Sequence, residues 1–396
     1  MIYDFETLVS RKNTGSGKWD EMTKEHPNLP ENVAPLSVAD MELKNPPEIV
    51  EGLKKYIDTH ILGYTGPTEE YFNAVCGWMK RRNDWDIKKE EIVSTHGVVT
   101  ALAVSVLAYT DPGDGVITMP PVYYPFRMTI EHNNRKNVEC PLINTNETYT
   151  IDFDLFEKLC AEEKNKMFIF CNPHNPVGRV WTEDEIAKLG AICAKHNVIV
   201  VSDEIHSDLI MPGHKHVAFA NACKDALPKY LVCTAPSKTF NLAGLVGSYH
   251  IVYNETLRDR ICAVSNKTHY NEMNVLSMHA LIGAYQPQGY EWVDELNQVL
   301  AGNIEYFCDY VDGHFEGVSY SRPQGTYMVF LDCTEWCREH GRDIQWLLDE
   351  GTRVGVGYQD GRPFHGPCHI RVNLALPLSR VKEACDRLDR YVFNAR

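Results

Sequence analysis

Short apolar runs alternate with longer amphipathic stretches between about residue 90 and residue 255. The runs are rich in β-branched and aromatic residues, as strands are; they are GVITM (115–119), MFIFC (167–171), VIVVS (198–202), YLVCTA (230–235) and SYHIVY (248–253). Thr182 and Glu185 have the spacing of a capping box and predict a helix that ends near His196. This alternation predicts an α/β fold with a mainly parallel sheet covered by helices.

The pattern changes after Tyr290. A long helical stretch is followed by a strand-like run at 327–332, a helix near 343–354, a second strand-like run at 369–374 and a final helix from Ser379. This order predicts a smaller α+β domain. We therefore expect an N-terminal arm (1–46) that joins the small domain, a large domain (47–288) and a small C-terminal domain (289–396).

Composition narrows the possible partners. The 396 residues include 54 Asp and Glu against 39 Lys and Arg, a net charge of −15, which argues against binding to nucleic acid or to anionic membranes. The chain has neither an apolar run long enough to cross a bilayer nor a signal peptide at its start, so we expect a cytoplasmic protein. Its thirteen cysteines, many in apolar stretches, predict reduced core thiols, and their spacing does not indicate a metal site.

Three polar side chains follow three of the predicted strands. Asn175 follows MFIFC, Asp203 follows VIVVS and Lys238 follows YLVCTA. Ligands of open α/β sheets bind beyond the carboxyl ends of the strands, so these side chains should meet in one crevice. Each alone has an ordinary explanation, as a turn former, a helix cap or a solvated surface residue. Together they match the needs of a pyridine cofactor, namely a Schiff-base amine, a partner for the ring nitrogen and a donor to the ring hydroxyl.

Two further segments could complete such a site. Gly97 precedes a strongly helical stretch, where the free N–H groups of Val98 and Val99 would point at a phosphate. Tyr123 or Tyr124, in the rigid turn after GVITM, could cover a planar ring. A helix start without a ligand and tyrosines that merely pack in the core remain open as alternatives.

Seven motifs, in order along nearly the whole chain, carry a family resemblance. They are SVADMEL (37–43), GYTGPTEEY (63–71), PPVYYPF (120–126), NPHNPVGRVW (172–181), SDEIHSDL (202–209), APSKTFNLAGL (235–245) and HIRVNL (369–374). The chain resembles the fold-type I enzymes of pyridoxal 5'-phosphate (PLP). Within them it resembles the cystathionine β-lyase and cystalysin branch, the carbon–sulfur lyases, of the class I/II aminotransferase family.

The resemblance implies a role for each motif residue. It implies that Lys238 is the Schiff-base lysine, that Asp203 pairs with the ring nitrogen and that Arg371 holds the substrate α-carboxylate. It also implies a cofactor site completed by Asn175 at the ring hydroxyl, Tyr123 on the ring, and Val98, Val99, Ser237 and a second subunit's Tyr64 at the phosphate. His206 is expected beside the cofactor and Tyr124 beside the substrate. A homodimer with shared active sites follows from the role of Tyr64.

Two positions depart from the related aminotransferases. Those enzymes have tyrosine where this chain has His206, and arginine where it has Val246. Both differences favour the lyase branch, and the second leaves the phosphate to N–H and hydroxyl donors.

The predicted activity is therefore a PLP-dependent β-elimination that releases a thiol, pyruvate and ammonia from a small sulfur amino acid. The sequence leaves the substrate open between cystathionine, cysteine and another S-substituted cysteine, with Tyr124 and Tyr327 as candidate contacts. An aminotransferase that uses the same groups is the first alternative. A PLP-binding regulatory protein with incidental lyase activity is the second.

Overall fold

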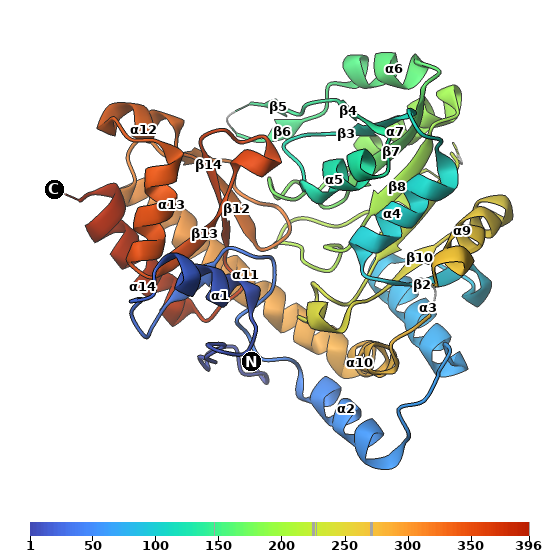
Figure 1. The fold of residues 1–396 in the computed structure, drawn as a ribbon, viewed down its shortest axis with the longest axis horizontal. Coiled ribbons are helices and arrows are strands. Elements are labelled where there is room, and N and C mark those ends of the chain that lie inside the picture. Colours follow the sequence, from blue (N-terminus) through green and yellow to red (C-terminus); the bar gives the residue numbers. More distant parts are fainter. Residues whose placement is uncertain (146, 224–225, 227, 270–271, 396) are drawn as a thin grey trace.

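A seven-stranded sheet lies at the centre of the larger part of the molecule (Figure 1). The computed structural model describes residues 1–145, 147–223, 226, 228–269 and 272–395. Within them the strand order is β2 (Ile92–His96), β10 (Gly247–Ile251), β9 (Tyr230–Thr234), β8 (Ile199–Asp203), β7 (Asn165–Cys171), β3 (Gly115–Thr118) and β4 (Lys136–Glu139). Strand β10 is antiparallel to both of its neighbours and the other neighbouring pairs are parallel, so the prediction of a mainly parallel sheet is confirmed.

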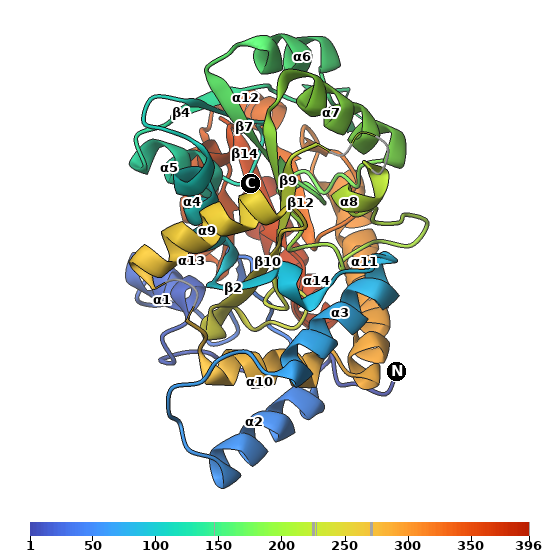
Figure 2. The ribbon, with the colours of Figure 1, turned by 90° about the vertical axis from the view of Figure 1, so that its right-hand side faces the viewer.

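Helices cover both faces of this sheet (Figure 2). On one face pack α4 (Val98–Tyr109), α5 (Pro125–His132) and α9 (Glu255–Thr268), and on the other α6 (Phe153–Ala161), α7 (Glu183–His196) and α8 (Phe219–Ala222). Successive residues of a strand point to opposite faces. In β7, Ile169 therefore joins the core under α4, while Phe168 and Phe170 join the core under α7. Burial on both faces explains why the strands are continuous apolar runs.

Four helices form the side of the molecule below this sheet in Figure 1. They are α2 (Pro47–Thr59), α3 (Glu69–Asn83), α10 (Val275–Ala284) and the long α11 (Pro287–His314). Helix α10 packs against α2, α3 and α11. Helix α2 projects outward, and a loop at residues 60–68 leads from it to α3 (Figure 1). No helix in the described part of the chain combines the length and apolar character that a bilayer crossing requires.

A second sheet belongs to the smaller part of the molecule. Its strand order in the described residues is β1 (Ala34–Leu36), β13 (Val356–Asp360), β14 (His369–Asn373), β12 (Met328–Asp332) and β11 (Ser319–Tyr320). The helices of this part are α1 (Gly17–Glu25), α12 (Thr334–His340), α13 (Ile344–Arg353) and α14 (Leu378–Leu388). Elsewhere, between β4 and α6 in the chain, β5 (Ile143–Asn144) pairs antiparallel with β6 (Tyr149–Thr150) in a separate two-stranded sheet. Strand β1 pairs in parallel with β13, so the start of the chain adds a strand to the C-terminal sheet. The domain limits at residues 46 and 288 stay predictions.

Candidate active site

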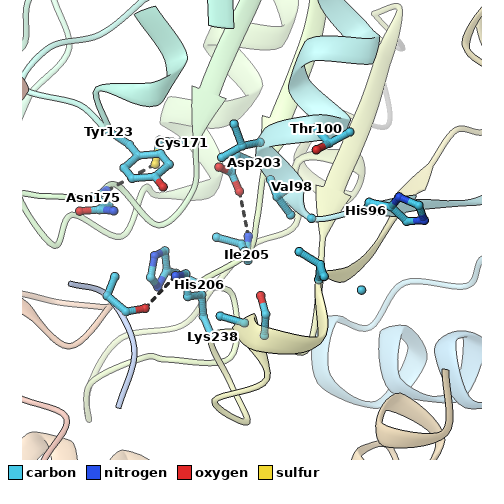
Figure 3. Close-up of a pocket in the computed structure, with 17 residues that line it drawn as sticks. His96, Val98, Thr100, Tyr123, Cys171, Asn175, Asp203, Ile205, His206 and Lys238 are labelled. Carbon is cyan, nitrogen blue, oxygen red and sulfur yellow. Dashed lines mark hydrogen bonds between the residues drawn. The ribbon is translucent and has the colours of Figure 1, made fainter. Parts of the chain in front are cut away.

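One edge of the large sheet gathers the ends of six strands. Strands β2, β3, β7, β8 and β9 all end there, and antiparallel β10 begins there, with Gly247 paired to His96. The turns after these ends enclose a cavity of about 270 Å³ (Figure 3). Its lining includes Ala39, Val98, Val99, Tyr123, Cys171, Asn175, Asp203, His206, Ser237, Lys238 and Val246. The structure thus brings together the three side chains that follow the predicted strands.

Lys238 lies in the turn after β9 with its amine at the cavity wall. Its Nζ donates a hydrogen bond of 2.7 Å to the backbone oxygen of Ala39. Burial, helped by the nearby Arg371 charge, lowers the pKa of Lys238 to about 8. Since a lysine in water has a pKa near 10.4, this environment makes the neutral, nucleophilic amine far more accessible at neutral pH.

Asp203 is the last residue of β8, opposite Cys171 in β7, and is 4% exposed. Its Oδ1 accepts a hydrogen bond of 3.1 Å from the Ile205 backbone N–H (Figure 3). Burial raises the pKa of Asp203 to about 7. A protonated ring nitrogen bound in the cavity would favour the charged carboxylate, because it offsets the lost hydration.

The start of α4 lies at the wall of the cavity. Gly97 precedes it with φ 78°, a left-handed conformation that favours glycine. The first helical bond runs from the Ala101 N–H to the Gly97 oxygen, so the N–H groups of Val98 and Val99 lie outside the helical ladder. Ser237 and Val246 line the cavity with them.

Arg371, from β14 of the smaller sheet, lies beside this cavity and is 3% exposed. Its Nη1 donates 3.2 Å to Asn175 Oδ1 and its Nη2 donates 3.3 Å to the Ser37 oxygen. Nε is buried and has no hydrogen-bond partner among the described residues. Burial lowers the pKa of Arg371 to about 10, so the group stays charged at neutral pH. An unpaired buried donor on a cation suits a carboxylate ligand.

Aromatic and imidazole groups complete the cavity wall. Tyr123 lines it, and burial raises the pKa of this phenol to about 12, so it is neutral at physiological pH. His206 also lines it, edge-on to the Tyr327 ring at 5.9 Å between centroids. Burial, followed by the Lys238 charge, lowers the pKa of His206 to about 3, so this ring is neutral as well.

Besides Arg371, two further predicted site residues lie outside the cavity lining. Tyr124 packs edge-on against Phe364 with 5.2 Å between ring centroids. Tyr64 stands fully exposed on the loop between α2 and α3. The roles assigned to both stay predictions, and that of Tyr64 concerns a second subunit.

Sequence reasoning missed Ala39, whose carbonyl oxygen holds the Lys238 amine. The SVADMEL motif was the available signal, but a backbone acceptor leaves no mark in the residue type. It also missed Cys171 and Ile205 as cavity walls.

Comparison with known proteins identifies the family. Residues 31–388 match the model of aminotransferase class I and II. The chain belongs to this family. It is similar to cystathionine beta-lyase PatB of Bacillus subtilis (strain 168), with 36% identity over 97% of this chain and 98% of the relative.

Two solved structures are similar over 98% of both chains. Cystalysin from Treponema denticola, which contains a pyridoxal 5'-phosphate cofactor, has a TM-score of 0.93 and 42% identity. A PLP-bound C-S lyase from Staphylococcus hominis has a TM-score of 0.89 and 31% identity. The family and the fold class predicted from the sequence are thus confirmed.

We expect Asp203→Asn to stabilise the ligand-free protein above pH 7. Folding raises the pKa of Asp203 from 3.8 to about 7. The stability that the protonated carboxyl contributes is therefore fully present below pH ~4 and is lost as the pH rises through ~7. Asparagine does not titrate, so the variant's advantage should grow from none near pH 4 to about 4 kcal/mol at pH 8.

Urea unfolding at pH 5, 6, 7 and 8 measures this difference. The exposed Asp184, in the first turn of α7, provides a control variant, Asp184→Asn, in which no such pH-dependent gain is expected. A stability difference for Asp203→Asn that stays constant over this pH range would contradict the buried-carboxyl interpretation.

Proposed function

We propose that this protein is a PLP-dependent carbon–sulfur β-lyase that cleaves S-substituted cysteines into a thiol, pyruvate and ammonia. The observation that carries the proposal is the presence of a buried amine, Lys238, and a buried carboxyl, Asp203, in the wall of one cavity. The similarity to a cystathionine beta-lyase and to cystalysin over nearly the whole chain supports the type of reaction.

The cavity residues fit PLP. Lys238 would bind its aldehyde carbon, Asp203 its ring nitrogen and Asn175 its hydroxyl, while Tyr123 would cover the ring. The N–H groups of Val98 and Val99 and the Ser237 hydroxyl would hold the phosphate. When bound, PLP supplies an electron sink for the pair of electrons left at the substrate Cα.

The protein's own groups then handle the substrate. The Arg371 guanidinium, oriented by Asn175, holds the α-carboxylate through charge-assisted hydrogen bonds. The Lys238 amine would take the Cα proton at Nζ. The Cβ–S bond breaks as the Cα–Cβ double bond forms, the thiolate leaves, and the enamine product is hydrolysed to pyruvate and ammonia. The Asp203 carboxylate would stabilise a positive charge at the ring nitrogen of the bound cofactor.

We further propose that two chains share each active site. Ile57, Ile61, Leu62 and Tyr64 expose an apolar surface on α2 and the loop that follows it. Apolar patches of this kind mark contact surfaces, and a symmetric dimer would cover this patch and carry Tyr64 to the phosphate site of the other subunit.

We also propose a cytoplasmic location, because the thirteen cysteine thiols are free and most are buried in the core.

Purified enzyme with PLP should release pyruvate and a thiol from cystathionine or another S-substituted cysteine without an added keto acid. A thiolate is a good leaving group, so we expect elimination to be faster than transfer of the proton to the cofactor. Alanine, which has no leaving group at Cβ, is the matched control and should yield at most slow half-transamination. Coupled pyruvate and thiol assays measure the outcome.

If turnover requires 2-oxoglutarate or another keto acid and no thiol is released from any S-substituted cysteine, the protein is an aminotransferase. Lys238→Ala should abolish either activity, because both reactions need the same base.

Hybrid dimers test the shared site. A protomer carrying Lys238→Ala and one carrying Tyr64→Ala should each form homodimers with little activity. Mixing them under conditions of subunit exchange should restore one competent site per hybrid, since it combines an intact Lys238 with the partner's Tyr64. Activity measured against mixing ratio gives the result. If activity does not recover although exchange is demonstrated by mass spectrometry, Tyr64 does not serve the partner's site.

A further inference from the structure

Residues 37–41 form a strap between the N-terminal segment and the cavity. Side chains around the active site bind the carbonyl oxygens along the strap. These bonds run from Arg371 to Ser37 (3.3 Å), from Asn373 to Val38 and Asp40 (2.7 Å each), from Lys238 and Tyr327 to Ala39 (2.7 and 3.0 Å) and from Asn241 to Met41 (3.0 Å). The strap therefore fixes the backbone oxygen that meets the catalytic amine.

A buried charge cluster holds the strap from its other side. Lys18, in α1, is 1% exposed, and its Nζ lies 2.8 Å from Asp40 Oδ1 and 3.0 Å from Glu42 Oε1. The same Nζ donates 3.0 Å to the Asp40 backbone oxygen. Arg11 pairs with both carboxylates at 2.9 and 2.8 Å, and the Trp19 indole N–H donates 3.0 Å to Glu42.

The charges in this cluster balance, two positive against two negative. A buried ammonium is costly unless it is paired, and here Nζ lies within ion-pair distance of two carboxylates and donates a hydrogen bond to one carbonyl oxygen. Burial acts to raise the pKa of Asp40, but its pairing with Lys18 and Arg11 leaves that pKa lowered. Lys18 thus contacts both the side chain and the backbone oxygen of Asp40, the residue next to Ala39.

We propose that Lys18 is a positioning residue for the lyase reaction, which fixes the Ala39–Asp40 peptide and through it the place of the Lys238 amine. The inference rests on the proposed function. Removing Lys18 leaves two carboxylates, Asp40 and Glu42, against the single cation Arg11, and the strap then relaxes toward water. The Ala39 oxygen moves with it, so the amine loses the acceptor that orients it.

The test compares two matched lysines in the PLP-loaded enzyme. Lys18→Met removes the buried charge at similar length, whereas Lys44→Met removes an exposed partner of Asp4, 2.8 Å away, on the same N-terminal segment. Lys18→Met should lower kcat per loaded site by about tenfold to a hundredfold with little change in KM, as expected for a small misplacement of a reacting group. Lys44→Met should keep both values. Lys18→Arg, which keeps the charge, should recover much of the loss.

Hydrogen exchange gives an independent readout. The Met41 N–H donates to Asn241 and the Glu42 N–H to Ala375, and both amides should exchange faster in Lys18→Met. If Lys18→Met does not fold, Asp40→Asn and its control Asp4→Asn repeat the comparison. We expect a lower kcat in Asp40→Asn and unchanged kcat and KM in Asp4→Asn.

Wild-type kcat and wild-type exchange in Lys18→Met or Asp40→Asn would overturn the inference, as would a loss of thermal stability with unchanged kcat per loaded site. Failure of the proposed function is distinguishable, because then the wild-type enzyme itself releases no thiol in this assay.

Discussion

Removal of water from Lys238 and Asp203 is the constraint on which the site depends. In water near neutral pH an amine would be protonated, and therefore neither nucleophilic nor basic, and a carboxyl would be ionised. At the carboxyl edge of the large sheet, burial lowers the pKa of Lys238 to about 8 and raises that of Asp203 to about 7. Such burial costs free energy, so it persists only because β7, β8 and β9 are anchored between two apolar cores.

The same sheet determines where the remaining chemistry lies. Parallel strands buried on both faces must be apolar throughout, so polar side chains can appear only where each strand ends. This is why Asn175, Asp203 and Lys238 were predictable from sequence as one cluster, and why the capping box at Thr182 located the start of α7 correctly. In each case the signal lay within a few residues of the feature it predicts.

Features that depend on distant segments were not predictable in this way. Lys238 and its acceptor Ala39 are 199 positions apart, and the acceptor is a backbone oxygen that any residue offers. Strand β2 was missed because its sequence, IVSTH, is short and half polar. Lys18 looks like an ordinary helical surface lysine until α1 is folded onto the strap. Packing between elements, rather than local pattern, decides these contacts.

The identity of the lysine that carries the cofactor tests the site most directly. Borohydride treatment of the PLP-loaded enzyme fixes the cofactor on the amine that holds it, and peptide mass spectrometry then locates the modified residue. Lys238 is the residue expected, with loss of the visible absorption band and of activity in proportion to modification. Modification of another lysine, or full activity after Lys238 has been modified, would contradict the assignment of this buried amine as the catalytic base.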